Sequence, residues 1–429
     1  MGILLLLLLI IQVFIGIPVA FSLAITSCLG FGYYANWNAA FIQLSSIVVS
    51  GISSYTLSVV PMFLLMGEFT FQSGITNDLY IAIRKWFGRL PGGLAISTNF
   101  AAALFGACSG STIASCSMFT KIALPEMQKG GYDNKLSTGA IASAGALACM
   151  IPPSILMIIY GIISQTSISK LLIAGILPGV LTALVFGLGI FIIALIRKDM
   201  APTFSEKVSL KERVIALKGI TPTLFLFTLI IGGLYLGWFT ATQGGAMGAL
   251  GALLILILRK KFTLKNFWYA LVSAGMLSCS LLLIVIFGNL FAQMLSMSGL
   301  IREITNFIIS LNIAPTLILL LILLIYLILG CLVDPTSMLI ITTPLFLPIA
   351  KAFGWHPIWF GIIVITMVEV GVITPPVGMN LFTVKGTAGT TVSITEIYLG
   401  ILPFLFMMAI IIGLIIVFPS IFLYLPLNM

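Results

Sequence analysis

Long apolar runs, separated by short polar links, fill almost the whole chain. Every position from Ile3 to Ile11 is apolar, and similar stretches recur to the end. A helix crosses the hydrocarbon core of a bilayer with about 20 apolar residues. We therefore expect membrane-embedded helical segments at approximately 3–27, 38–52, 55–80, 93–128, 136–163, 171–196, 219–238, 242–258, 266–296, 314–353, 357–384 and 393–425.

The fold class follows from these runs. Backbone groups in lipid must be satisfied within the protein, and a helical bundle achieves this. A transmembrane barrel would need segments of about 10 residues with alternating polarity, which the continuous apolar runs lack. The pattern predicts an all-α polytopic membrane protein.

Composition narrows the function classes. Of 429 residues, 60% are hydrophobic, 7% are charged and His356 is the only histidine. The six cysteines lie singly, without CxxC pairs that would indicate a metal or redox site. With one histidine, the chain has few residues from which a histidine-based catalytic triad could form. We therefore expect that the protein is not an enzyme and binds no cofactor. The net charge is +9, and most of the basic residues lie in the links between apolar segments. The positive-inside rule of membrane proteins explains this distribution better than nucleic-acid binding does.

The chain divides at its one substantial polar stretch. Residues 197–218 read RKDMAPTFSEKVSLKERVIALK, which suits a cytoplasmic link with an interfacial helix. The predicted units are N-terminal scaffold helices 1–54, repeat 1 at 55–197 with hairpin 93–128 and broken helix 136–163, link 198–218, scaffold helices 219–279, and repeat 2 at 280–429 with hairpin 314–353 and broken helix 357–384.

An internal repeat supports this division. Gly106 and Gly330 lie 224 positions apart, and the Pro152-Pro153 and Pro375-Pro376 pairs lie 223 apart. Gly175-Ile176-Leu177-Pro178 recurs after 225 positions as Gly400-Ile401-Leu402-Pro403. Three anchors with nearly one offset indicate two related halves.

Charge predicts how the halves are oriented. Basic residues flank segment 93–128 on both sides, at Arg84, Lys85 and Arg89 before it and at Lys129 and Lys135 after it. Both ends then lie in the cytoplasm, so the segment is a re-entrant hairpin. The matching links of the second half are poor in Lys and Arg, which favours the outer side. The repeats are therefore expected to be inverted, as in many secondary transporters.

The turns of the two hairpins carry polar groups. The first reads GACSGST from Gly106 and the second GCLVDPTS from Gly330. Freed carbonyls, hydroxyls and the Asp334 carboxylate suit an alkali cation, and the restarting helix N-terminus suits an anion. The alternatives are packing contacts for the small residues and a helix cap for Asp334.

Proline pairs should interrupt the helix that follows each hairpin. Pro152-Pro153 and Pro375-Pro376 each remove backbone donors, and the freed carbonyls could complete ion shells begun at the turns; a plain kink is the alternative. Glu68 and Glu369 lie within apolar stretches, either as proton-coupling groups, or paired with neighbours or snorkelling toward the membrane surface. Asn380, Thr383, Ser154 and Tyr160 follow the breaks and could face a polar ligand or bond a neighbouring helix.

These residues resemble a known family. FGACSGSTIAS and MIPPS, answered by LGCLVDPTS and ITPPVGMN, are similar to the large membrane subunit of the tripartite ATP-independent periplasmic (TRAP) transporters, over essentially the whole chain. The resemblance implies a multi-pass protein of the bacterial inner membrane that imports organic acids such as C4-dicarboxylates or sialic acids. It also implies Na⁺ as coupling ion, an elevator mechanism, and two partners, a small four-helix membrane subunit and a periplasmic substrate-binding protein.

The resemblance also implies site residues. One sodium site would involve Ser109, Gly110, Gly145 and Pro152, and the other Asp334, Thr336, Ser337, Gly371 and Thr374. Substrate would lie between the tips, near Ser111, Thr112, Pro153, Pro376 and Asn380. A stand-alone Na⁺/dicarboxylate or citrate carrier, and a channel or structural subunit, are the competing hypotheses.

Overall fold

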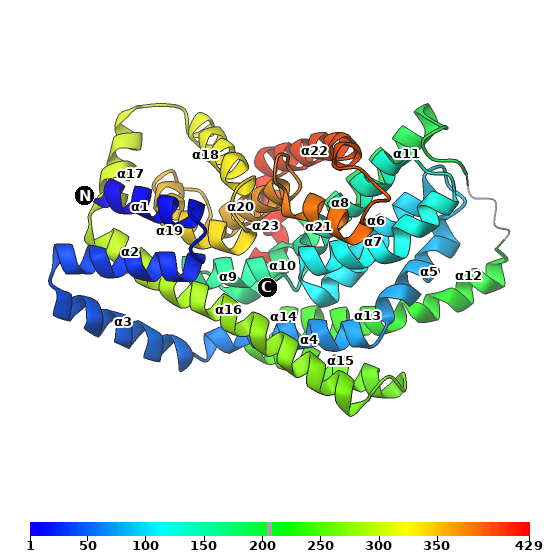
Figure 1. The fold of residues 1–429 in the computed structure, drawn as a ribbon, viewed down its shortest axis with the longest axis horizontal. Helices are drawn as coiled ribbons and strands as arrows, with labels where there is room; N and C mark the ends of the chain where they lie inside the picture. Colours follow the sequence, from blue (N-terminus) through cyan, green and yellow to red (C-terminus); the bar gives the residue numbers. More distant parts are fainter. Residues whose placement is uncertain (204–207) are drawn as a thin grey trace.

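The predicted all-α fold is confirmed in the residues that the computed structural model describes, 1–203 and 208–429, where every regular element is helical (Figure 1). The first half contains α1 (Gly2–Phe14), α2 (Val19–Tyr34), α3 (Trp37–Ile52), α4 (Val59–Gln72), α5 (Ile75–Phe87), α6 (Gly93–Ser109), α7 (Thr112–Lys129), α8 (Asn134–Met150), α9 (Ile155–Ser164), α10 (Ile168–Ala174) and α11 (Ile176–Ile196). The remainder contains α12 (Leu210–Ala216), α13 (Thr221–Phe227), α14 (Gly233–Tyr235), α15 (Ala241–Leu258), α16 (Leu264–Met297), α17 (Leu300–Ser310), α18 (Pro315–Gly330), α19 (Pro335–Ala352), α20 (Pro357–Val372), α21 (Met379–Ala388), α22 (Ile394–Val417) and α23 (Pro419–Leu427).

The helices are long and apolar enough for a multi-pass membrane protein. Five helical stretches of the described chain could cross a bilayer singly, and three bent pairs bring the number to eight. The longest is α16, which has 34 residues and a length of about 51 Å at 1.5 Å per residue. This exceeds the hydrocarbon thickness of about 30 Å, so α16 must tilt or emerge from the bilayer.

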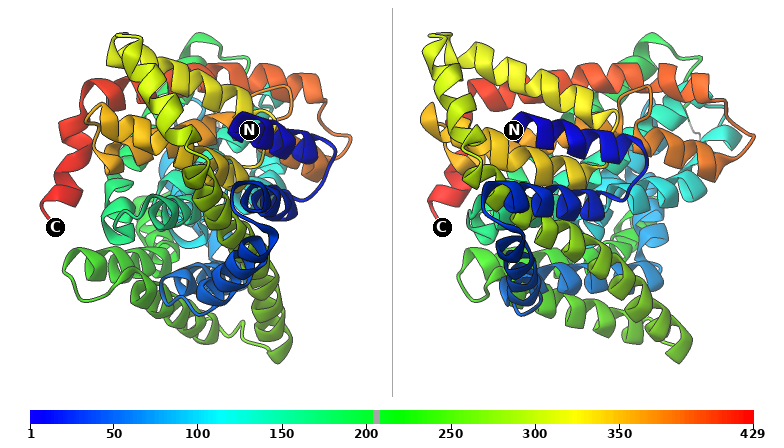
Figure 2. Two further views of the ribbon diagram at one scale, coloured as in Figure 1. Left: turned by 90° about the vertical axis from the view of Figure 1, so that its left-hand side faces the viewer. Right: turned by 60° about the vertical axis from the view of Figure 1, so that its left-hand side comes forward.

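Several helices form a layer around α16, which runs diagonally through Figure 1 and packs against α2, α3 and α4. In turn, α4 packs against α15, and it makes an angle of 58° with α3. In the left view of Figure 2, α1 (blue) and α23 (red) lie toward opposite edges of the bundle. We call α4, α15 and α16 the scaffold layer.

Two predicted continuous segments are divided by proline. Segment 3–27 contains two helices, because Pro18 lacks an N–H donor and Gly16 adopts φ +93°, so that α2 restarts after Pro18. Segment 393–425 divides at Pro419, which occupies the first turn of α23. Segment 55–80 also divides, because Gly74 adopts φ +73° between α4 and α5.

The interrupted segments of the two halves pack in matching ways. In the first half α6 and α7 pack against α8, and α8 and α9 meet at an angle of 44°. In the second half α18 and α19 pack against α20, which is followed by α21 after a gap at residues 373–378. Both halves therefore contain a helix pair laid against a broken helix.

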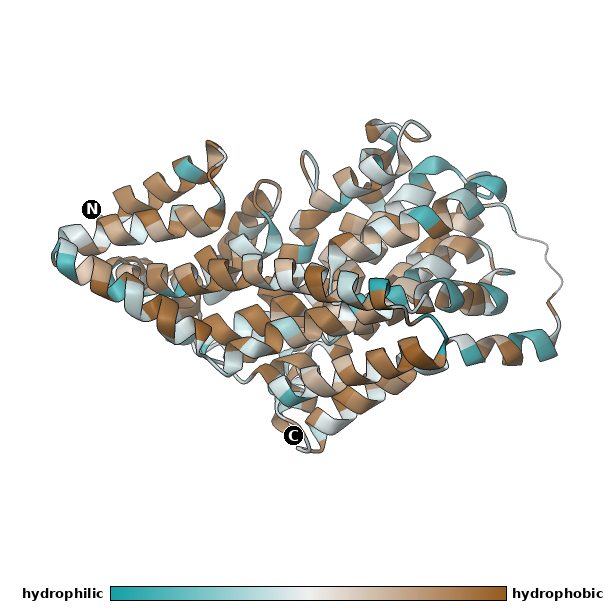
Figure 3. Cartoon of the chain, turned by 60° about the horizontal axis from the view of Figure 1, so that its bottom comes forward, coloured by the Kyte–Doolittle hydropathy of each residue, from teal (hydrophilic) through white to brown (hydrophobic). Residues whose placement is uncertain are grey.

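Charged links gather at one end of the molecule. Arg84 at the end of α5 pairs with Glu126 near the end of α7, and Asp78 pairs with Arg259 after α15. The indole of Trp86 donates to the Arg213 carbonyl at 3.1 Å. Figure 3 shows hydrophilic residues concentrated around these links and at α12, while most helix interiors are hydrophobic.

The predicted link 198–218 includes residues 204–207, which lie outside the described chain. Its described part contains α12, which begins with a capping box in which Ser209 and Glu212 bond each other's backbone. Leu210, Val214 and Ile215 of α12 are exposed.

Candidate functional site

The first break separates α6 from α7 at Gly110 and Ser111. Gly110 adopts φ +58°, and a Cβ there would lie 2.8 Å from the Pro153 carbonyl oxygen. Only glycine fits both conditions. Ser111 then caps α7 by accepting the Ala114 N–H at 3.3 Å. The remaining N–H groups of the first turn of α7 are thereby placed beside the break.

The second break separates α18 from α19 at residues 331–334. Asp334 caps α19, and its Oδ2 accepts the Ser337 N–H at 2.9 Å. Pro335 follows in the first turn, where a missing N–H has no cost. The hydroxyl of Ser337 is buried and has no hydrogen-bond partner. A helix cap and an unpartnered buried hydroxyl thus lie within one turn.

In each half, the backbone of the first hairpin helix packs directly against the backbone of the broken helix, α6 against α8 and α18 against α20. A Cβ on Gly106 would lie 2.4 Å from the Ala148 Cα, and one on Gly330 would lie 2.6 Å from the Gly371 Cα. Side chains are too large for either crossing, so the glycines set the distance between the helices. Each contact lies just before a Pro-Pro pair of the broken helix.

Asn380 joins the two halves. This α21 side chain is fully buried, donates to the Ala142 carbonyl at 3.0 Å and to the Thr112 hydroxyl at 2.9 Å, and accepts from Thr112 at 3.1 Å. The same two residues pack against Gly145 of α8. A Cβ at Gly145 would lie 3.1 Å from the Thr112 carbonyl oxygen and 3.0 Å from the Asn380 amide nitrogen. Residues separated by more than half the chain therefore meet behind the first break.

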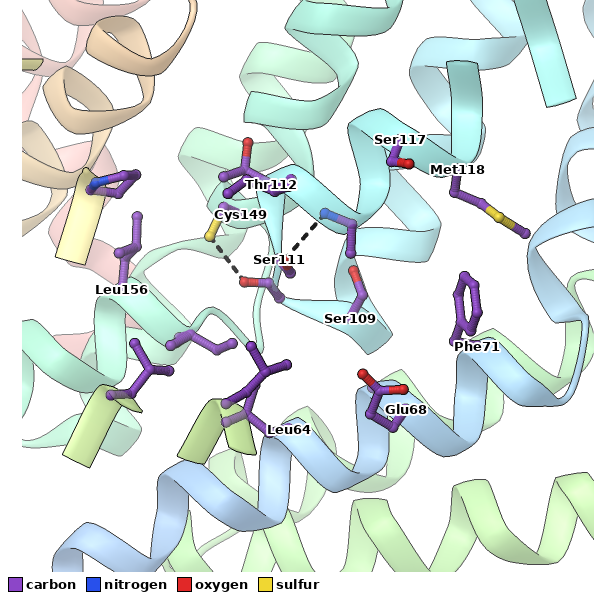
Figure 4. Close-up of a pocket in the computed structure, with 18 of the residues that line it drawn as sticks. Leu64, Glu68, Phe71, Ser109, Ser111, Thr112, Ser117, Met118, Cys149 and Leu156 are labelled. Atoms are coloured by element: carbon purple, nitrogen blue, oxygen red, sulfur yellow. Dashed lines mark hydrogen bonds between the residues drawn. The ribbon is translucent and has the colours of Figure 1, made fainter. Parts of the chain in front are cut away.

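One cavity of about 500 Å³ brings both breaks together with the scaffold layer. Figure 4 shows the side of this cavity that the first break and α4 form. Six of the expected residues line it: Ser109, Gly110, Ser111, Thr112, Asp334 and Thr336. The scaffold layer contributes Gly67 and Glu68 from α4 and Tyr269 and Ser280 from α16. In Figure 4 the Glu68 carboxylate faces Ser109, and Ser273 of α16 donates to Glu68 at 2.8 Å.

Sequence comparisons identify the family of this chain. Residues 5–421 match the family described as the tripartite ATP-independent periplasmic transporter, DctM component. The chain belongs to this family. It is therefore a large membrane subunit of a TRAP transporter, and membership in a transporter family agrees with the expectation that it is not an enzyme.

Individual relatives align with most of this chain over most of their own length. The C4-dicarboxylate TRAP transporter large permease protein DctM of Pseudomonas aeruginosa is 34% identical over 87% of this chain and 86% of its own length. The ectoine TRAP transporter large permease protein TeaC of Halomonas elongata is 32% identical over 96% and 95%. The sialic acid TRAP transporter large permease protein SiaM of Vibrio cholerae is 29% identical over 96% and 95%.

A solved structure shares the fold. The YdaH transporter of Alcanivorax borkumensis superposes with a TM-score of 0.61 over 90% of each chain, at 15% identity. That likeness concerns the arrangement of helices alone.

The other expected residues of this TRAP subunit lie behind the cavity wall or at the breaks of α8 and α20. Gly145, Ser337, Gly371 and Asn380 are buried, and the Thr374 hydroxyl donates to the Val370 carbonyl at 2.6 Å. Pro152 and Pro153 are buried within the break after α8, and the Pro376 carbonyl accepts from the Tyr398 hydroxyl. None of these lines the cavity, although Met379, next to Asn380, does.

Sequence reasoning missed several residues of the wall. Ala114, Ser117, Met118 and Lys121 line the cavity along one face of α7. Their spacing of three and four residues is that of a single helix face, which was the available signal. Lys121 supplies an amino group to the wall, and Glu68 and Asp334 supply carboxyl groups. Tyr269 of α16 gave no signal, because only the tertiary fold brings it to the cavity.

Proposed function

We propose that this TRAP subunit imports organic acids, such as C4-dicarboxylates or sialic acids, in symport with Na⁺. One observation carries the proposal: both helix breaks line the same cavity against the scaffold layer. A binding site formed by discontinuous helices is the arrangement that secondary transporters use for anions and coupling ions.

The chemistry of the wall suits an organic acid. The N-terminus of α7, capped by Ser111, directs N–H groups and the positive end of the helix dipole toward the break. Ser109, Thr112 and Ser117 add hydroxyl groups, and Lys121 adds one ammonium. A carboxylate held by these groups needs no deeply buried cation from the protein.

The second break suits Na⁺. A hard cation takes oxygen ligands from carboxylates, hydroxyls and carbonyls. Asp334 supplies a carboxylate and Ser337 an unpartnered buried hydroxyl, while Thr336 lies between them. Such an unpaired oxygen is costly in a membrane interior unless something binds it, which supports a cation here.

We further propose inverted repeats and an elevator mechanism, in which the hairpins move past the scaffold layer. The crossings of Gly106 with Ala148 and of Gly330 with Gly371 support the repeats, because they recur at offsets of 224 and 223 positions. The gathering of basic links at one end supports a cytoplasmic side there, and hence insertion in the bacterial inner membrane.

The proposal includes two partners, a small four-helix membrane subunit and a periplasmic substrate-binding protein, because the relatives are named as large permease proteins of TRAP transporters. Proteoliposomes holding this chain and the small subunit test it. With loaded binding protein outside, an inward Na⁺ gradient should drive uptake of labelled succinate or sialic acid. Equal uptake without the gradient would refute Na⁺ coupling. Robust uptake by the chain alone would instead indicate a stand-alone carrier.

A further inference from the structure

Glu369 is the least satisfied ionisable group of the described chain. It lies in α20, one turn before the break, and its exposed fraction is 0%. Neither carboxylate oxygen has a hydrogen-bond partner. The side chain adjoins Thr112 at the first break and Cys149 at the end of α8. It therefore lies where α20 of the second half meets the broken elements of the first.

The surroundings supply no positive charge. The described residues contain no ion pair with Glu369, and Lys170, on α10, acts on His356 at the opposite end of α20. The Cys149 thiol donates to the Gly110 carbonyl at 3.1 Å. An ionised carboxylate without a partner is costly to bury, because its charge loses hydration and gains nothing in return.

Protonation of Glu369 would remove the charge but only part of the free-energy cost of burying the group. A neutral carboxyl group has an O–H donor that needs an acceptor, and neither oxygen of Glu369 forms a hydrogen bond in the structure. A metal cation can be bound by both oxygens at once. Because one carboxylate carries one charge, a monovalent ion neutralises it completely. The described residues also contain no group of three or more His, Cys, Asp or Glu side chains that would suit a transition metal.

We propose that Glu369 is the charged ligand of a Na⁺ site at this junction, with the Thr112 hydroxyl as a neutral ligand. The proposal rests on the Na⁺ coupling proposed above and adds a ligand to it. Thr112 exchanges hydrogen bonds with Asn380, and its hydroxyl oxygen retains a lone pair for an ion. The site joins α20 to the tip of α7, so an ion bound there holds the two halves together.

The test compares Na⁺ binding by the purified full-length protein and its variants. Wild type should be stabilised against thermal unfolding by NaCl relative to choline chloride at equal ionic strength. Glu369→Gln removes the charge and keeps the size. We expect it to bind one ²²Na⁺ fewer per chain and to need at least about tenfold more Na⁺ for half of any remaining stabilisation. Glu303→Gln, at an exposed carboxylate of α17, is the matched control and should behave as wild type.

The outcomes separate this inference from the proposed function. If Na⁺ stabilises wild type and Glu369→Gln equally, Glu369 is not a ligand, whereas the Na⁺ coupling stands. If Na⁺ has no effect on wild type, both proposals fail. If Glu369→Gln does not fold, Glu369→Asp decides: it keeps the charge on a side chain shorter by one methylene. A weakened but retained Na⁺ response supports the site, and an unchanged response overturns it.

Discussion

The side chain of Asn380 in α21 holds that of Thr112 in α7 by two hydrogen bonds, with Asn380 Nδ2 2.9 Å from Thr112 Oγ1 and Thr112 Oγ1 3.1 Å from Asn380 Oδ1. The two residues are 268 positions apart. A third bond, to the Ala142 carbonyl, extends this contact to α8. The second half of the chain thus fixes the start of the helix that forms the first break.

Replacing Asn380 by alanine should destabilise the protein. The change leaves the buried Thr112 hydroxyl without its partner, at a cost of roughly 1–3 kcal/mol, and removes the additional bond to the Ala142 carbonyl of α8. We expect a clearly lower midpoint of thermal unfolding in detergent, and a lower rate of uptake. Asn428→Ala, at an exposed asparagine near the C-terminus, is the control. Equal midpoints for the two variants would contradict the structural role.

Two roles of Asp334 can be separated, the helix cap that the structure shows and the cation ligand that we propose. Asparagine caps helices about as well as aspartate, so Asp334→Asn should fold with nearly wild-type stability. Asp334→Ala should cost about 0.5–2 kcal/mol through the lost cap and still fold. Both variants should lose Na⁺-driven uptake in proteoliposomes. Wild-type coupling in either variant would remove Asp334 from the cation site.

The crossing of Gly330 with Gly371 should tolerate no side chain. A Cβ on Gly330 meets a backbone Cα, which cannot rotate away, so Gly330→Ala should cost about 1–3 kcal/mol or more by overpacking. Gly275→Ala in α16 is a matched control, because a Cβ there meets nothing within 4 Å. That variant should be neutral or gain at most about 1 kcal/mol from helix propensity. Chemical or thermal unfolding of both variants would measure the difference.

Stability should fall as acid protonates His356. Burial, with a smaller effect of nearby Lys170, lowers the pKa of His356 below its ordinary value. Its Nδ1 caps α20 by accepting the Ile358 N–H at 3.3 Å, which only the unprotonated nitrogen can do. As the pH falls below about 6.5, the unfolded chain takes up the proton before the folded chain does, so stability is lost.

A variant isolates this titration, because His356 is the only histidine. His356→Asn keeps a capping side chain that does not titrate near neutral pH. Between pH 7 and pH 5 the unfolding midpoint of wild type should fall by more than that of His356→Asn. Parallel curves for the two proteins would show that the cap is unimportant.

The helix breaks were predictable because local chemistry causes them. Gly110 needs φ +58°, Asp334 caps the next helix, and Pro18 and Pro419 lack a donor, so each effect depends on the residue and its neighbours in the chain. The divisions at Pro18 and Pro419 were nevertheless missed, because hydropathy stays high across them. A run of apolar residues shows burial in lipid and does not show where one helix ends and another begins.

The composition of the cavity wall was only partly predictable for a different reason. The tips were expected from their polar residues, whereas the positions of Tyr269 and Lys121 depend on how α16 and α7 cross the other helices. Glu369 was noticed as an acid in an apolar run, yet its lack of any partner is a property of the packed interior. One sequence contains the local causes and leaves such distant contacts undetermined.

The cavity has walls of two origins, and this has a consequence for affinity. Glu68 and Tyr269 come from the scaffold layer, and Ser109 and Asp334 come from the hairpins. The affinity for a ligand that contacts both sets depends on their relative position as much as on any single residue. If the two sets slide, the ligand loses one wall, and its dissociation constant rises although neither wall changes shape. Substrate release would then need no separate gate, because the movement that delivers the ligand also weakens its binding.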